Sequence, residues 1–411
     1  MALEHIIVLD LTHMLSGPYG TMLLADLGAR TIKIEPITGE GTRRLLEKNP
    51  DYSRDSMGAY FLTLNRNKES VVADLKSEAG KKVFFDLVRK ADVVFDNFSA
   101  GVTQRLGIDY ASLAKINPRI VTCSVTGFGQ TGPETQLPAF DQVVQGMSGG
   151  MSITGTPEGG PVRSGIPIGD LGGGVFGAIG VLAALAERER TGKGQHVDVS
   201  MLDAQISLLN YIATMHLLSG KVPSPIGNSH FVHVPYNSFV TSDGYIIIAC
   251  IGDAFFERFV NEFDMKELCK PEYRQQPGRY AAKEEIETVI AKETKKHTTK
   301  YWLDRLRAAR IPCAPVNNLQ QALSGIQVRA RDMIVDVKLN SGDTVRMPGN
   351  PVKLSGTSRQ TYASPPYVGE HTQSVLAELL GYSKKEIDAY CTKLESDSAR
   401  ATNIRMLEVE G

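Results

Sequence analysis

The sequence of 411 residues lacks the features of a membrane, secreted or nucleic-acid-binding protein. No apolar run approaches the ~20 residues that span a bilayer, so we expect no membrane partner. The N-terminal run MALEHIIVLDL is strand-like and contains acidic residues, so we expect no signal peptide. With 45 Lys and Arg against 46 Asp and Glu, the formal net charge of −1 argues against a general nucleic-acid binder. An anionic ligand would therefore need a local basic cluster.

Cysteine is also scarce, and the five cysteines are scattered, with none in a CxxC pair. This pattern excludes a disulfide framework and a cysteine zinc site, and it predicts a protein of the reducing cytoplasm. The eight histidines form no HxH, HExxH or Cys/His array, so we expect no metal. A serine hydrolase is not expected either, because the region of Ser200 and Ser207 reads as helix.

The first third of the chain alternates strand-like and helix-like segments. Strands are expected at His5–Leu11, Arg30–Glu35, Val71–Leu75, Asp92–Asp96 and Arg119–Ser124. Helical stretches such as Glu78–Lys90 separate them, which predicts βαβ crossovers and a parallel sheet. A long helix is expected at Val175–Arg190 and a hairpin within HFVHVPYNSFVTSDGYIIIAC. We therefore expect an α/β fold with a large domain at 1–225, a smaller α+β domain at 226–325, and a C-terminal segment, 326–411, that returns to the large domain.

The loop after the first strand runs from Thr12 to Gly20, and Glu35 closes the second strand. This placement resembles a dinucleotide site, but the glycine spacing G-P-x-G does not match G-x-G-x-x-G, so we do not expect NAD. The loop either binds another phosphorylated ligand or is a plain turn before a helix with Pro18 at its first position. A basic series follows, which is either a phosphate site or solvated surface charge: Arg43, Arg44, Arg66, Lys68, Lys76 and Arg105.

Asp170 opens a helix rich in small residues and is followed by Gly172, Gly173 and Gly174. An acid at this position is either an ordinary helix cap or a nucleophile beside free backbone N–H groups that would hold an intermediate oxyanion. The three glycines reduce helix propensity, which favours a close approach of something large to the backbone.

Long segments in the same order resemble the class III CoA-transferases, the CaiB/BaiF family. They include VLDLTHMLSGPYGTMLLADLGARTIKIEP, NRNKESVVADLKS, ADVVFDNFSAG, NPRIVTCSVTGFGQTGP, IPIGDLGGGVFGAIGVLAALAERERTGKGQHVDVSMLDA and GEHTQSVLAEL. The segments DLTHMLSGP, ARTIKIEP and MPGNPVKLSG carry a narrower likeness to the acetyl-CoA:oxalate and formyl-CoA:oxalate CoA-transferases. The resemblance implies a Rossmann-like large domain and a homodimer of two threaded, interlocked rings.

The resemblance also implies a role for particular residues. Asp170 would form a mixed anhydride with the donor acyl group and then an aspartyl-CoA thioester. The donor would be acetyl-, formyl- or succinyl-CoA and the acceptor a small acid such as oxalate. Coenzyme A would be held by residues of the first domain, namely His13, Leu15, Ser16, Arg43, Lys76, Asn97, Phe98 and Arg105. Substrate contacts would come from Phe140, Asp141, Gly172 and His230, although His230 could equally be a structural residue of the hairpin.

The sequence departs from the family pattern at several positions. Phe140 stands where the racemase branch has a histidine, so proton exchange at an α-carbon would lack its second group. Gly227-Asn228-Ser229-His230 replaces a run of four glycines in the formyl-CoA branch, Leu15 replaces a glutamine and Ile37 an arginine. An acyl-CoA racemase and a non-catalytic CoA- or nucleotide-binding protein are the alternatives, and glutarate, malate or another C4–C6 diacid remains open as acceptor.

Overall fold

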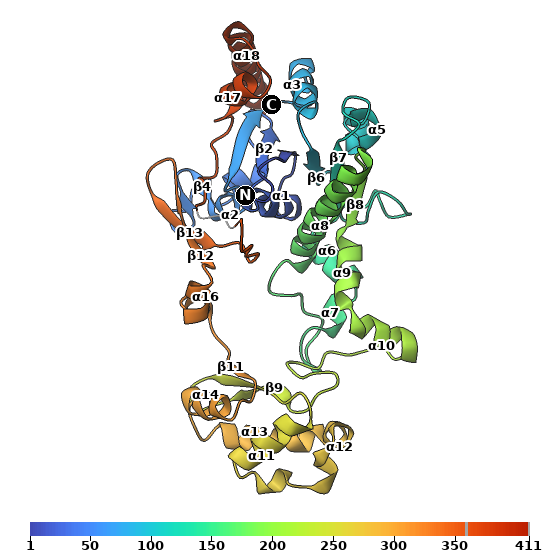
Figure 1. Cartoon of the computed structure of the whole chain (residues 1–411), viewed down its shortest axis with the longest axis vertical. Helices are drawn as coiled ribbons and strands as arrows, with labels where there is room; N and C mark the ends of the chain where they lie inside the picture. Colours follow the sequence, from blue (N-terminus) through green and yellow to red (C-terminus); the bar gives the residue numbers. More distant parts are fainter. Residues whose placement is uncertain (358–360, 410–411) are drawn as a thin grey trace. The chain divides into compact units, whose positions relative to one another are not determined.

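The computed structural model describes residues 1–357 and 361–409 (Figure 1). The chain forms two compact units. The larger unit comprises Met1–Gly150, Ser164–Thr214 and Ala330–Gly411, and the smaller unit comprises Met151–Arg163 and Met215–Arg329. The larger unit is thus built from three separate segments of the sequence.

The larger unit contains a six-stranded sheet in the order β5-β2-β1-β6-β7-β8, with every neighbouring pair parallel. Its strands are β1 (Ile7–Asp10), β2 (Arg30–Glu35), β5 (Lys68–Val72), β6 (Val93–Asp96), β7 (Val121–Thr126) and β8 (His196–Ser200). This confirms the predicted α/β fold with a parallel sheet. The strand order reverses between β1 and β6, and ligands of such sheets bind at the carboxyl ends of the strands at this point.

Helices cover both faces of the sheet, and strand residues alternate between two cores. Val8 of β1 belongs to one core and Leu9 to the other, as expected for a strand buried on both faces. The helices of this unit are α1 (Ser16–Asp26), α2 (Ala59–Leu64), α3 (Glu78–Val88), α4 (Val102–Leu106), α5 (Tyr110–Leu113), α6 (Asp141–Met147), α8 (Ile168–Thr191), α9 (Met201–Leu209), α17 (Thr372–Glu378) and α18 (Lys384–Val409), with the 3-10 helix η1 (Gly41–Arg44). Two small antiparallel pairs complete it, β3 (Ser53–Arg54) with β4 (Met57–Gly58) and β12 (Ile334–Lys338) with β13 (Thr344–Pro348).

Helix α8 begins seven residues before the expected start at Val175, so that Asp170 lies inside its first turn. Within the described residues it is the one helix long and apolar enough to cross a membrane, and half of that apolar window is buried. It packs against α1, α9 and strands β7 and β8, as the core helix of a globular domain does.

The C-terminal segment joins the edge of the parallel sheet. The amide of His371 donates to the carbonyl of Ser70, and the amide of Val72 donates to the hydroxyl of Thr372. The Tyr390 hydroxyl donates to the carbonyl of Val72. These bonds attach α17 and α18 to β5.

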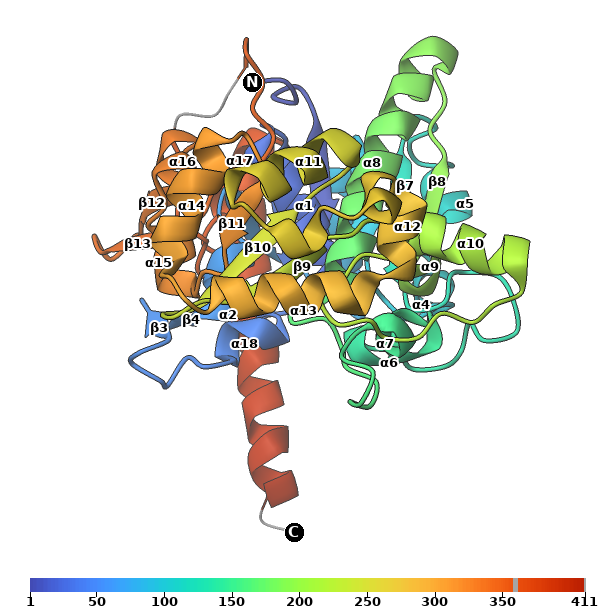
Figure 2. The same ribbon diagram turned by 90° about the horizontal axis from the view of Figure 1, so that it is seen from below.

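The smaller unit contains a three-stranded antiparallel sheet in the order β11-β10-β9, and Figure 2 shows its helices around β9 and β10. The predicted hairpin is confirmed, because β9 pairs with β10 across the turn between Val240 and Tyr245. The elements are β9 (Tyr236–Val240), β10 (Tyr245–Ala249), β11 (Cys313–Pro315), α11 (Asp253–Glu262), α12 (Gln276–Ala281), α13 (Lys283–Thr294), α14 (Thr299–Ala308) and α15 (Leu319–Leu323), with η2 (Lys266–Leu268) and η3 (Pro271–Arg274). Helices α7 (Gly150–Ile153), α10 (Tyr211–Ser219) and α16 (Ile326–Ala330) cross unit boundaries. The only tryptophan of the sequence, Trp302, is buried in the core of this unit and donates from Nε1 to the carbonyl of Thr294.

Candidate active site

The first turn of α8 presents Asp170 next to a second carboxylate, Asp141. The backbone amides of Gly169 and Asp170 both donate to Oδ1 of Asp141, at 2.8 and 3.3 Å. The side-chain amide of Gln145 donates to Oδ2 of Asp141 at 2.6 Å. Asp141 therefore caps α8 from 28 residues earlier in the chain. The expectation of free N–H groups beside Asp170 is wrong, because Asp141 occupies them.

The environment of Asp170 raises its pKa to about 6, mainly through burial and further through the negative charge of Asp141. The carboxyl group is half-buried, so it combines partial access with a desolvated position. A carboxylate of raised basicity in such a place is suited to act as a nucleophile or a general base.

The charges of Asp170 and Asp141 also act on Tyr60 of α2, a residue that the sequence did not indicate. Burial raises the pKa of its phenol, and the charges of Asp170, Asp141 and Glu40 add to that shift. The phenol therefore stays protonated at neutral pH and can donate a hydrogen bond. No motif marks it in the sequence, since Tyr60 is close to the two aspartates only in the folded chain.

The glycines of α8 allow close packing of helices, and the large group that approaches their backbone is helix α1. A Cβ atom on Gly174 would lie 2.4 Å from the carbonyl oxygen of Ser16, and one on Gly20 would lie 2.7 Å from the carbonyl oxygen of Gly174. The backbones of α1 and α8 thus meet at the helix end that carries Asp170. Gly172 differs, because its Cβ would meet the end of the Leu208 side chain at 3.3 Å and the Cβ of Ala204 at an ordinary 3.8 Å.

A cavity of about 570 Å³ lies at the carboxyl ends of β5, β2, β1 and β6. This volume falls in the range of small-molecule and cofactor sites. Four of the predicted coenzyme-binding residues line it together. The lining consists of Leu11, Thr12, His13, Ile34, Glu35, Pro36, Glu40, Ala73, Asp74, Leu75, Lys76, Phe98, Val102, Arg105 and Leu106.

Two exposed basic side chains of the cavity are available to an anion, while its acidic residues accept hydrogen bonds from the chain. Glu35 pairs with Arg43 at 2.6 Å and accepts from the Ser70 hydroxyl at 2.6 Å. Oδ1 of Asp74 accepts from the backbone amide of Lys76 at 2.9 Å. The side chains of Lys76 and Arg105 are exposed and form no ion pair with any residue that the structure describes.

Asn97 joins the loop after β6 to the loop after β1. Its Oδ1 accepts from the backbone amide of His13 at 2.9 Å, and its Nδ2 donates to the carbonyl of His13 at 2.7 Å. The rings of His13 and Phe98 lie 5.5 Å apart at the cavity. Asp96 accepts from the Phe98 amide at 3.1 Å and thereby holds the second loop. Asn97 therefore positions the cavity wall and is not itself a lining residue.

Other residues of the predicted basic series lie in buried ion pairs. Arg43 binds Glu35 and also donates to the carbonyl of Pro366. Arg66 pairs with Asp26 at 2.7 Å, and Lys68 pairs with Asp10 at 2.8 Å. Arg44 is exposed and does not line this cavity. Arg66 and Lys68 therefore lie in buried ion pairs, which differs from both a phosphate site and solvated charge.

Leu15 and Ser16 begin α1 outside the cavity lining. Leu15 is the residue before the first turn, and Ser16 is buried against α8. Phe140 precedes α6 and its side chain is 69% exposed. A phenyl ring there offers no group for proton transfer.

His230 lies in the smaller unit, where its Nδ1 accepts from the amides of Val232 and His233 at 2.9 and 3.2 Å. Its ring packs against those of His233 and Tyr236, with centroids 4.8 and 5.0 Å away. These contacts match the structural role for His230 that the sequence left open.

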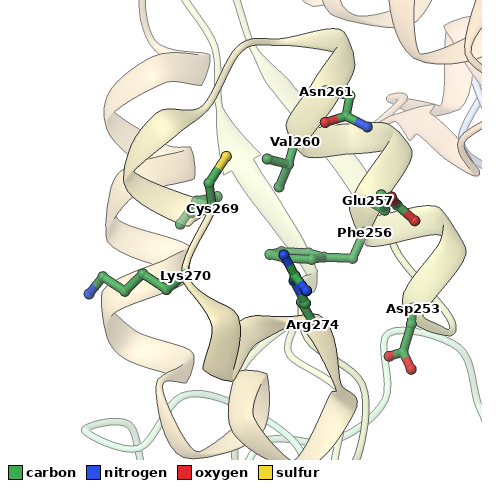
Figure 3. A pocket seen from close by; sticks show the side chains of 9 residues that line it. Asp253, Phe256, Glu257, Val260, Asn261, Cys269, Lys270 and Arg274 are labelled. Atoms are coloured by element: carbon green, nitrogen blue, oxygen red, sulfur yellow. The ribbon is translucent and has the colours of Figure 1, made fainter.

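A second cavity, of about 430 Å³, lies in the smaller unit and contains none of the predicted site residues. Figure 3 shows Phe256 at its centre with Arg274 next to the ring, and Cys269 and Lys270 on the facing segment. Lys270 is engaged by Glu285, and Asp253 by Arg279. The side chains at this cavity do not form an arrangement of nucleophile and base.

Comparison with known proteins identifies relatives along most of the chain. The sequence model described as CoA-transferase family III matches residues 3–372. The chain is 43% identical over 356 residues to an acetyl-CoA:oxalate CoA-transferase of Acetobacter aceti, covering 86% of this chain and 89% of that protein. It is 37% identical over 384 residues to a succinate–glutarate CoA-transferase of Agrobacterium fabrum, with 92% and 95% covered.

A solved structure agrees with the sequence relatives. The crystal structure of a CaiB/BaiF family protein from Brucella suis matches this chain with a TM-score of 0.80 at 34% sequence identity. The match covers 91% of this chain and 98% of that one.

Proposed function

The chain belongs to CoA-transferase family III, and on that basis we propose that it moves CoA from an acyl-CoA donor to a small carboxylic or dicarboxylic acid through intermediates on Asp170. One observation carries this proposal. The loop after β1 lines the cavity at His13 and contacts the helix of Asp170 at Ser16. His13 and Ser16 are three residues apart, which places their Cα atoms at most about 11 Å from each other. One extended ligand could therefore occupy the cavity and also reach the carboxylate.

Coenzyme A has the chemistry that this arrangement accommodates. Its phosphates would bind Lys76 and Arg105, two cations of the cavity that form no ion pair among the described residues. Its adenine would contact the rings of His13 and Phe98. The pantetheine arm would follow the loop at Leu15 and Ser16 and bring the thiol sulfur to Asp170. Asn97 and Arg43 would act indirectly, by holding His13 and Glu35.

The proposed reaction proceeds by acyl transfer without net proton exchange. An oxygen of the Asp170 carboxylate attacks the thioester carbon, the C–S bond breaks, and CoA leaves as thiolate. The thiolate attacks the aspartyl carbon and releases the donor acid, which leaves an aspartyl-CoA thioester. The acceptor carboxylate then attacks the aspartyl carbon and displaces the thiolate. The thiolate finally attacks the acceptor's acyl carbon and regenerates the Asp170 carboxylate.

The surroundings of Asp170 suit this chemistry. Both intermediates would hydrolyse in water, and the packing of α1 on α8 limits access of solvent from that side. The raised pKa makes the carboxylate a better nucleophile, and it remains ionised above about pH 6.

We expect a short acid as acceptor. The relatives include enzymes named for oxalate and for glutarate, so both are candidates. The protonated phenol of Tyr60 is a suitable hydrogen-bond donor to an acceptor carboxylate near Asp170. A role of His230 in acceptor binding stays a prediction. Specificity constants for oxalate, succinate, glutarate and malate, each with acetyl- and succinyl-CoA, would identify the acceptor.

A homodimer is part of the proposal. Large apolar side chains remain exposed on the single chain, including Leu217, Leu218 and Val222 at 79–84% and Leu319 and Ile326 at 79% and 89%. Helix α10 buries none of its residues within the chain. Exposed apolar surfaces of this kind mark protein interfaces, and a second copy of the chain would cover them.

The decisive experiment replaces Asp170 by Asn, which keeps the shape and removes the nucleophile. We expect CoA binding to persist and transfer to fall by at least a thousandfold. Hydroxylamine added with acyl-CoA should convert Asp170 of the wild type to a hydroxamate, which mass spectrometry of peptides detects. Turnover by Asp170→Asn near the wild-type rate would refute the mechanism.

A further inference from the structure

Two buried hydrogen-bond donors next to the Asp170 turn have no acceptor within the described part of the chain. They are the hydroxyl of Ser16, in a residue 3% exposed, and the side-chain nitrogen Nε2 of Gln205, in a residue 5% exposed. A buried donor left without a partner costs about 1–3 kcal/mol, so such groups are rare unless a ligand or an intermediate satisfies them.

Both donors face the same part of α8. Nε2 of Gln205 lies 2.6 Å from the point where a Cβ atom on Gly169 would be, and Oγ of Ser16 lies 2.7 Å from the corresponding point on Gly173. Because Cβ positions tilt toward the start of a helix, a group at the Gly173 position lies over the preceding turn, which contains Asp170. Asp170 and Gly173 are three residues apart and share a helix face.

The side chain of Gln205 lies between Ser148 and α8. Its Oε1 lies 3.2 Å from the Ser148 hydroxyl, which is also 3.1 Å from the carbonyl of Gln145, and its Nε2 lies next to Gly169. Ser16 is the first residue of α1, and the carbonyl of Ser16 is in close contact with Gly174. Neither side chain can turn to water without disturbing this packing.

The reaction needs hydrogen-bond donors that the helix itself does not provide. When a nucleophile adds to the aspartyl carbon, two electrons of the C=O bond move onto the oxygen, and they return when the leaving group departs. An oxyanion of this kind is stabilised by preorganised donors. The amides of Gly169 and Asp170 are already bonded to Asp141, so donors must come from neighbouring elements.

The geometry points to Ser16 and Gln205 as the oxyanion donors for the tetrahedral adducts at the Asp170 carbonyl. This inference rests on the proposed function, because it requires Asp170 to be acylated. Ser16 then has a catalytic role, in addition to its predicted contact with coenzyme A. Gln205, which no sequence motif indicated, becomes a catalytic residue contributed by α9.

The test compares Ser16→Ala and Gln205→Leu with the wild type, using acetyl-CoA with oxalate and succinyl-CoA with glutarate. We expect kcat to fall about 10²–10³-fold for each variant, as for loss of an oxyanion donor elsewhere. The KM for acyl-CoA should change less than threefold for Gln205→Leu, since Gln205 is not among the proposed coenzyme-binding residues. The melting temperature should stay equal or rise, because an unsatisfied buried donor is removed. Thr31→Val removes a buried hydroxyl at the other end of β2 and should leave kcat unchanged.

Further variants separate catalysis from packing. Ser16→Cys keeps the size but weakens the donor, and Gln205→Met keeps the length without a donor, so both should lower kcat while the protein stays folded. The inference fails if the variants retain kcat within threefold, or if only KM rises. If wild-type protein forms no adduct at Asp170 with either acyl-CoA, the proposed function fails as well. If the wild type forms the adduct and both variants form and discharge it at the wild-type rate, only this inference fails.

Discussion

Asp170 in the first turn of α8 and Asp141 at the start of α6 have different roles. Asp141 accepts two backbone amides and one side-chain amide, so its charge is compensated by three donors. Asp170 has a partly desolvated carboxyl beside that charge, and its pKa is raised to about 6 as a result. The fold therefore keeps a carboxylate that is unfavourable for stability, as is common at sites under selection for activity.

The raised pKa predicts how activity and stability vary with pH. The folded state binds the Asp170 proton more tightly than the unfolded state, where the pKa is near 3.8. The contribution of Asp170 to stability is thus present below pH 3.8 and is lost as pH rises through about 6. kcat/KM for acyl-CoA should fall below about pH 6, where the nucleophile is protonated. A pH–rate profile measures this, and a profile that is flat from pH 5 to 8 would contradict it.

Two variants serve as controls for that profile. Asp170→Asn should raise the melting temperature at pH 8 by a few degrees, because it removes a desolvated charge. Asp141→Asn keeps a side-chain oxygen for the α8 amides and removes the neighbouring charge, so it should shift the activity profile toward lower pH.

The proposed role of Arg105 in the cavity predicts how its replacement changes the KM for acyl-CoA. Arg105→Ala should raise the KM for acyl-CoA about tenfold to a hundredfold, since a hydrogen bond to a charged group contributes roughly 1.5–3 kcal/mol. kcat should change little, because Arg105 lines the cavity and Asp170 carries the chemistry. Arg331→Ala, an exposed arginine outside the cavity, is the matched control. Equal KM values for Arg105→Ala and the wild type would remove Arg105 from the site.

Among the structural elements, the contact between α1 and α8 sets the position of the nucleophile. Gly20, Gly173 and Gly174 let the two helices approach until backbone atoms touch. Asp170 and Ser16 are thereby placed by the same contact, one on each helix.

This contact can be tested with two neighbouring glycines. Gly174→Ala places a methyl group 2.4 Å from the Ser16 carbonyl and should destabilise the fold by about 1–3 kcal/mol. Gly172→Ala has a movable leucine end at 3.3 Å as its nearest neighbour, and it should be neutral or stabilising because alanine favours helix. Urea denaturation of both variants measures the difference. Equal stabilities would show that the close contact does not determine the position of α8.

The sequence predicted the elements that depend on local pattern. The parallel strands and the hairpin follow from short apolar runs and turn residues, and both are found. The sequence did not predict that Arg66 and Lys68 are buried. Their partners Asp26 and Asp10 lie far away in the chain, and only the folded sheet brings them together. The sequence also did not predict that Asp141 caps α8 or that Tyr60 lies near the two aspartates. These residues too are far apart in the chain.

At the scale of the whole molecule, the larger unit is assembled from three separate chain segments, and the smaller unit from two. The long excursion from Met215 to Arg329 leaves the larger unit and returns to it. Such a chain path is compatible with the threaded dimer that the family resemblance implies.

A measurement of molecular mass in solution tests the proposed dimer. Multi-angle light scattering at micromolar concentration should give twice the chain mass of 44.8 kDa, with no folded monomer on dilution. Leu218→Asp, at an exposed apolar position of α10, should weaken association. A stable, folded and active monomer would exclude the proposed assembly.

The buried position of Trp302 has a consequence for spectroscopy. As the only indole of the sequence, it accounts for all tryptophan emission, and it lies in the core of the smaller unit. A red shift of that emission during chemical denaturation therefore reports the opening of the smaller unit. Far-UV circular dichroism reports the helices of both units. A difference between the two transition curves would show that the units unfold independently, without any label being attached.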